Sequence, residues 1–118
     1  MSTNQHDAKV NEMILSGQAM AAFEEFYADG VVMQENDDEP CVGKDANRKR
    51  EEQFFGSVEA FHGAELQASA VSGDTAFSQW SWDLTFKGAG RVQMNQVAVR
   101  TWKDGKVVKE RFYYGTGH

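Results

Sequence analysis

The feature that most constrains the fold is a pair of long segments, residues 75–87 and 91–103, in which apolar and polar side chains alternate. Alternation with a period of two is typical of β-strands whose two faces meet different environments. Asp104-Gly105, which follows the second segment, is the strongest short hairpin signal in the chain. Together with segments 65–71 and 105–115, this pattern predicts a meandering antiparallel sheet for the second half.

The first half shows helical spacing instead, with apolar residues three and four positions apart. The predicted elements there are helices over 7–15, 20–27 and 43–58 and a short strand over 31–35. An acidic loop that contains Pro40 separates this strand from the third helix. We therefore expect one α+β domain over residues 1–118, with a mostly antiparallel sheet of about five strands on three N-terminal helices.

The charge pattern argues against a nucleic-acid partner. The formal net charge is −6, and the basic run Arg48-Lys49-Arg50 is followed at once by Glu51-Glu52. Nucleic-acid binding needs a clustered basic surface, which this run does not form. Its charges indicate the solvated face of a helix. The polar half of that helix, 47–52, either projects into solvent or faces a wet cavity.

The remaining composition predicts a cytoplasmic protein with no membrane partner. No stretch approaches transmembrane length, and residues 1–9 lack the apolar core of a signal peptide. Cys41 is the single cysteine, so an internal disulfide is excluded and a reducing compartment is favoured. The histidines, His6, His62 and His118, show no metal-ligand spacing, and we expect neither a metal nor a cofactor.

The order of these elements resembles the SnoaL-like polyketide cyclase family of the nuclear-transport-factor-2-like superfamily. The motifs that carry the resemblance are Phe26-Tyr27-Ala28-Asp29 before the first strand and Asp104-Gly105-Lys106-Val107-Val108 before the last. Ketosteroid isomerases and scytalone dehydratase belong to the same superfamily. The resemblance implies a cone-shaped, strongly curved sheet whose hollow is closed by the helices to form a pocket. It also implies a homodimer joined through the outer face of the sheet.

The family's catalytic residues carry over only in part. In the isomerase branch a general base ends the first strand, and the resemblance places Glu35 there. The positions of the isomerase oxyanion hole fall at Val97 and at Asn11 or Glu12, and those of the cyclase acid–base pair at Ala98 and Gly115. Both sets are therefore missing, and a fold by itself specifies no reaction.

Glu35 and Asp83 are the candidate catalytic residues. A carboxyl group beside a pocket has its pKa raised by desolvation, which suits a general base working near neutrality. Glu35 has an alternative interpretation as the first residue of an acidic loop. For Asp83, resemblance to the isomerases turns its face of the strand into the hollow, whereas the alternation alone equally allows that face to lie in solvent.

The choice of strand face decides the other site predictions. With the Asp83 face inside, the candidate ligand-binding residues are Arg50, Phe54, Gln79, Ser81, Asn95, Val97, Phe112 and Tyr114. The opposite face would then be covered in a dimer, through Trp80, Trp82, Met94 and Trp102. With the faces reversed, the core consists of Trp80, Trp82, Leu84 and Phe86.

Two functions remain open at this stage. The absence of both catalytic sets favours a protein that binds a small molecule and has no catalytic role. The alternative is a cofactor-independent isomerase, cyclase or dehydratase that acts on a small carbonyl compound with Glu35 as general base.

Overall fold

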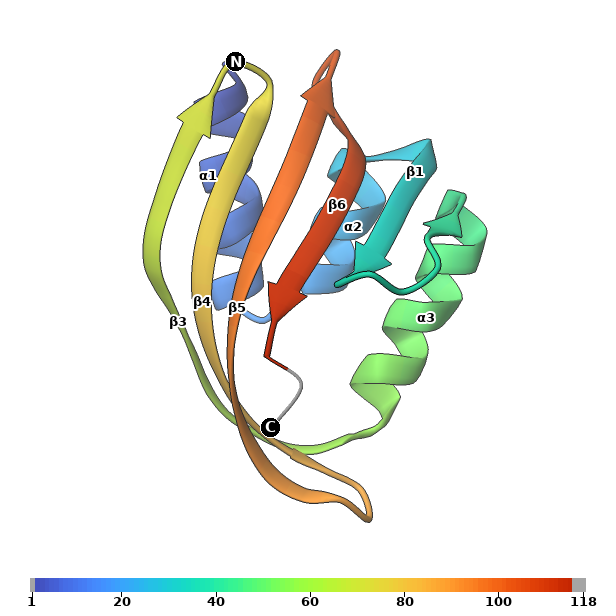
Figure 1. Ribbon diagram of the computed structural model, residues 1–118, viewed down its shortest axis with the longest axis vertical. Helices are drawn as coiled ribbons and strands as arrows, with labels where there is room; N and C mark the ends of the chain where they lie inside the picture. Colours follow the sequence, from blue (N-terminus) through green and yellow to red (C-terminus); the bar gives the residue numbers. More distant parts are fainter. Residues whose placement is uncertain (1, 116–118) are drawn as a thin grey trace.

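A computed structural model describes residues 2–115 of the protein. Over this range three helices lie on one side of a six-stranded sheet (Figure 1). The helices are α1 (Thr3–Leu15), α2 (Ala19–Phe26) and α3 (Lys44–Gly56). The strands are β1 (Tyr27–Glu35), β2 (Cys41–Val42), β3 (Val58–Ser72), β4 (Thr75–Phe86), β5 (Gly90–Lys103) and β6 (Lys106–Tyr114). The α+β class is confirmed, and the strand beyond the predicted five is the two-residue β2.

The strands follow the order β2-β1-β6-β5-β4-β3, and neighbours are antiparallel except for the parallel pair β1 and β6. The long strands β3, β4 and β5 curve around α1 (Figure 1). The ladder between β3 and β4 has three register shifts, and such irregularities bend a sheet. The curvature gives the sheet a concave face toward the helices, as the resemblance implies.

The concave face carries the even-numbered residues of β4 and β5. Trp80 is 1% exposed and Trp102 is 3% exposed, whereas Phe77 and Val97 on the opposite face are 39% and 37% exposed. The prediction that Trp80, Trp82, Met94 and Trp102 face outward is therefore wrong. Shifting a strand by one residue reverses every side chain, and the apolar set has most to gain from burial beneath the helices.

Most of the core lies between α1, α2 and the concave sheet. Its buried apolar residues are Val10, Met13, Ala22, Phe23, Tyr27, Val31, Met33, Ala76, Trp102 and Val107. On the other side of the cone, Asn47 attaches α3 to β1, because its Nδ2 donates to the carbonyl oxygens of Val31, Cys41 and Gly43. Because Trp102 belongs to the core of one chain, it is buried there and cannot serve as an interface residue.

The predicted hairpin at Asp104-Gly105 is confirmed. Both residues have positive φ, 52° and 77°, which is the conformation that a two-residue turn between twisted strands requires. The start of β3 differs from expectation, since the strand begins at Val58 and not near Glu65. The third helix stops at Gly56, two residues before its predicted end, so that Phe61 lies on β3.

Candidate functional site

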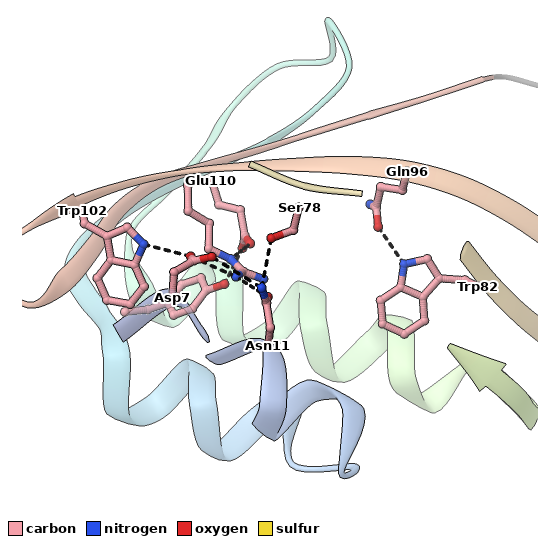
Figure 2. Close-up of polar contacts among 9 residues, drawn as sticks. Asp7, Asn11, Ser78, Trp82, Gln96, Trp102 and Glu110 are labelled. Carbon is pink, nitrogen blue, oxygen red and sulfur yellow. Dashed lines mark hydrogen bonds and ion pairs between the residues drawn. The ribbon is translucent and has the colours of Figure 1, made fainter. Parts of the chain in front are cut away.

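A cavity of about 790 Å³ lies between the concave sheet and the helices. Aromatic side chains form much of its wall, namely Phe23, Tyr27, Phe54, Phe55, Phe61, Trp80, Trp82 and Phe112. The rings of Trp80 and Trp82 are stacked with centroids 5.2 Å apart. Trp82 Nε1 also donates to Gln96 Oε1 at 3.0 Å, and Figure 2 shows this pair on the helix side of the sheet. This part of the wall is therefore largely apolar and is held in place by packing and hydrogen bonds.

The exposed members of the lining mark the mouth of the cavity. Phe55 and Phe61 are 41% and 59% exposed, and Gly17 in the turn between α1 and α2 is also exposed. The cavity therefore opens between the end of α3, the start of β3 and this turn. The buried lining residues Ala98 and Arg100 mark its floor.

A buried polar network forms the floor of the cavity (Figure 2). Arg100 Nε donates to Glu110 Oε2 at 2.7 Å, and Arg100 Nη1 donates to Asn11 Oδ1 at 2.7 Å and to Asp7 Oδ1 at 3.2 Å. Tyr27 donates its hydroxyl to Glu110 Oε1 at 2.6 Å. These contacts join α1 to β1, β5 and β6 at one point, because a buried charge must find paired and hydrogen-bonded partners.

Protonation states in this network follow from its burial. Burial and the charge of Glu110 raise the pKa of Tyr27 well above its usual value, so its hydroxyl keeps the proton that it donates. Burial alone would lower the pKa of Arg100, but Tyr27, Glu110 and Asp7 together raise it. The floor thus presents a permanently charged guanidinium held by two carboxylates.

A second polar group lies in the wall formed by α3 and the end of β1. Arg50 Nη2 donates to Glu35 Oε2 at 2.8 Å, and both side chains are more than a third exposed. Glu51, the next residue of α3, is half-buried and lines the cavity. Burial and the charges of Glu110 and Glu35 raise the pKa of Glu51 to about 7, although Arg50 acts in the opposite direction. Glu51 therefore exchanges a proton near neutrality.

The cavity contains only part of the predicted site. Four of those residues line it, namely Glu35, Arg50, Phe54 and Phe112. Tyr114 is outside the lining, and burial and the charge of Glu35 raise its pKa. The remaining five predicted site residues lie on the outer face of the sheet, so the prediction that they face the hollow is wrong. They are Gln79, Ser81, Asp83, Asn95 and Val97. Trp80, Trp82 and Met94, assigned to a dimer interface, line the cavity instead.

Asp83 forms an ordinary surface ion pair. Arg91 donates to its carboxylate through Nε at 2.9 Å and Nη2 at 2.7 Å. The hydrogen bond from Arg91 lowers the pKa of Asp83, and partial burial opposes it. The structure thus separates Asp83 from the cavity and removes it as a candidate acid or base there.

The sequence alone did not indicate four of the site residues, namely Glu51, Arg100, Glu110 and Tyr27. Arg100 lies in the same alternating set as Ala98 and Trp102, so a charge among apolar neighbours was the available signal. For Glu51 the signal was helical spacing, since Glu51 is four residues after Asn47 and three before Phe54.

Between residues 2 and 115 no three His, Cys, Asp or Glu side chains gather as a potential metal site. No helix in that range is long and apolar enough to span a membrane.

The family model of the SnoaL-like domain matches residues 1–114. The chain belongs to the SnoaL-like domain family. A solved structure from Mesorhizobium loti, described as a candidate SnoaL-like polyketide cyclase, is 30% identical to the chain with a TM-score of 0.87. The alignment covers 97% of this chain and 100% of that one. The family resemblance stated from the sequence is thereby confirmed.

More distant structures share the fold of this SnoaL-like domain. A protein from Catenulispora acidiphila with a ketosteroid-isomerase-like fold, solved with trimethylamine, is 10% identical with a TM-score of 0.77, covering 98% of this chain and 88% of that one. An NTF2-like protein of unknown function from Burkholderia pseudomallei is 14% identical with a TM-score of 0.82, covering 98% and 93%. No functionally curated protein matches the chain. At these identities the likeness extends to the fold alone.

Proposed function

We propose that this SnoaL-like protein binds a small, largely apolar molecule in the cavity of its cone. The observation that carries the proposal is the cavity itself, about 790 Å³ in volume, with aromatic and aliphatic side chains in much of its wall and polar side chains gathered at the floor and along α3. Sites for small molecules have this size and this composition. The absence of the family's two catalytic sets favours binding as the primary role.

Filling the cavity tests this proposal. Ala98 is buried at the floor of the cavity, while its neighbour Val97 points to the outer face. Ala98→Phe should abolish binding of an uncharged aromatic probe, 2-acetonaphthone, measured by calorimetry, and Val97→Phe should leave it intact. Quenching of Trp80 and Trp82 fluorescence should report the same difference. Equal binding by the two variants would place the probe outside the cavity and contradict the proposal.

A second candidate function, proton transfer next to a carbonyl group, is favoured by the position of Glu51. Its side chain lines the cavity and hydrogen-bonds to no other residue between 2 and 115. A carboxyl group that titrates near pH 7 suits a general base. Glu35 also lines the cavity and remains the alternative base, although its carboxylate is engaged by Arg50.

Exchange of the acetyl protons of 2-acetonaphthone with deuterium oxide, followed by NMR, separates the two candidate bases. If Glu51 abstracts the proton, Glu51→Gln should reduce exchange by about 100-fold or more, and Glu35→Gln should have a smaller effect. The catalysed rate should rise with pH through about 7, because only the ionised form of Glu51 accepts a proton. Loss of exchange in Glu35→Gln alone would assign the base to Glu35. If the wild type catalyses no exchange, proton transfer is refuted and binding remains as the proposed function.

We further propose that the protein forms a homodimer through the outer face of its sheet. That face exposes Phe77, Val97 and Tyr113, which come from three adjacent strands. Apolar side chains gathered on one face commonly mark an interface. The proposal keeps the dimer that the family resemblance implies, with a different set of contact residues.

A further inference from the structure

We propose that Arg100 forms a recognition subsite on the cavity floor for an uncharged hydrogen-bond acceptor of the ligand, such as a ketone oxygen. The inference rests on the proposed function, since it assigns the polar end of the ligand that the cavity would bind. A guanidinium group has five N–H donors and no acceptor, so its partner must accept a hydrogen bond.

The donor available for this contact is the terminal nitrogen Nη2 of Arg100. Nε and Nη1 are engaged by Glu110, Asp7 and Asn11, whereas Nη2 hydrogen-bonds to no residue in the range 2–115. Asn47 Oδ1 is the one fully buried side-chain nitrogen or oxygen in that range without a hydrogen-bond partner. Nη2 therefore keeps some accessible surface, although Arg100 as a whole is 2% exposed. Because Arg100 lines the cavity, that surface faces its interior.

The charge balance of the floor selects an uncharged acceptor over an anion. Arg100 pairs with two carboxylates, those of Asp7 and Glu110, so the group carries a formal charge of −1 before any ligand arrives. A ligand carboxylate would add a second uncompensated negative charge in a buried site, which is costly. A cationic ligand group would be repelled by the positive charge of the guanidinium itself. A neutral oxygen satisfies Nη2 without either penalty.

The rest of the floor holds Arg100 in place for this contact. Its guanidinium is fixed on one side by Glu110 from β6 and on the other by Asp7 and Asn11 from α1. Trp102 Nε1 donates to Asp7 Oδ1 at 3.0 Å, and Asn11 Nδ2 donates to Ser78 Oγ at 3.1 Å. Figure 2 shows these side chains gathered between α1 and the sheet. A donor held in this way loses little entropy when it binds the ligand.

The test compares two probes of the same shape, 2-acetonaphthone and 2-isopropenylnaphthalene, in which a methylene group replaces the ketone oxygen. Calorimetry gives the ratio of their affinities in the wild type, in Arg100→Lys and in Arg91→Lys. Arg91→Lys is the matched control, since Arg91 lies on β5 outside the cavity. The preference for the ketone should fall about tenfold in Arg100→Lys, as expected for a lost hydrogen bond to a charged donor, and should not change in the control.

A second measurement applies even if Arg100→Lys does not fold. In wild-type protein labelled with ¹⁵N-arginine, the side-chain signals of Arg100 should shift on addition of 2-acetonaphthone and much less on addition of the alkene. 2-Naphthoate, the matched anion, should bind more weakly than the ketone. Tighter binding of 2-naphthoate would overturn the assignment of an uncharged acceptor.

The outcomes separate this inference from the proposed function. If both uncharged probes bind with a ratio that Arg100→Lys does not change, the subsite is refuted and the binding cavity stands. The same holds if Arg100 signals respond equally to the ketone and the alkene. If neither probe binds the wild type, the proposed function fails, and the subsite fails with it.

Discussion

At the scale of single residues, Glu51 places a titratable carboxyl group in the lining of the cavity. Its pKa of about 7 lies above the ordinary value of 4.5, because burial and nearby carboxylates disfavour the charged form. The folded state therefore holds the proton more tightly than the unfolded state. The stability contributed by Glu51 is fully present below about pH 4.5 and is lost as the pH rises through about 7.

Glu51→Gln should remove this pH dependence. At pH 8 the variant should be more stable than the wild type by about 1–2 kcal/mol, a value reduced from the full shift because Glu51 is partly exposed. At pH 4 the two proteins should differ little. Urea unfolding at several pH values measures the effect, and Glu52→Gln, exposed on the same helix, is the control. Identical behaviour of the two variants at pH 8 would show that Glu51 is fully solvated.

At the scale of secondary-structure elements, α1 is joined to the sheet by polar as well as apolar contacts. Asn11 accepts a hydrogen bond from Arg100 Nη1 and donates one to Ser78 Oγ, so a single side chain connects α1 to β4 and β5. Asn11 is 3% exposed. Since α1 also covers the cavity through Val10 and Ile14, these bonds help to determine the position of the cavity wall.

Asn11→Ala should lower the free energy of unfolding by about 1–3 kcal/mol, because Arg100 Nη1 and Ser78 Oγ each lose a buried partner. Glu12→Ala on the exposed side of the same helix should change it by less than about 0.5 kcal/mol. Urea denaturation followed by circular dichroism compares the two variants. An equal loss in both would show that helix propensity, and not the buried network, accounts for the effect.

At the scale of the whole molecule, the two faces of the sheet have separate roles. The concave face provides the core and the cavity within one chain, which leaves the outer face free for a second copy. The dimer proposed above therefore leaves the cavity of each protomer unchanged, and disrupting the interface should not impair ligand binding.

Val97→Glu should convert the dimer to a monomer, because it places a charge at the centre of the proposed interface. Light scattering after size exclusion measures the change, and binding of 2-acetonaphthone by the monomer should persist. Val42→Glu is the control, since Val42 is 67% exposed on the edge strand β2, which β1 and β6 separate from β5. A wild-type protein that is monomeric at all concentrations would contradict the proposal.

Much of the architecture could be predicted from local sequence patterns. The alternation over 75–87 and 91–103, the hairpin at Asp104-Gly105 and the helical spacing of the first half correspond to observed elements. Each of these signals depends on residues close together in the chain. The family could be recognised for the same reason, since its motifs are short and lie at the turns between elements.

Local patterns in the sequence specify the elements and the family, whereas packing in three dimensions selects the strand face that is inside and the residues that share the cavity. Alternation defines two faces but leaves open which one the helices cover, and this choice places Trp80 inside and Asp83 outside. Glu51 and Arg100 come from separate elements, and nothing in the spacing between them indicates a shared site. That both line one cavity follows from how α3 docks on the curved sheet, which is a property of packing between distant segments.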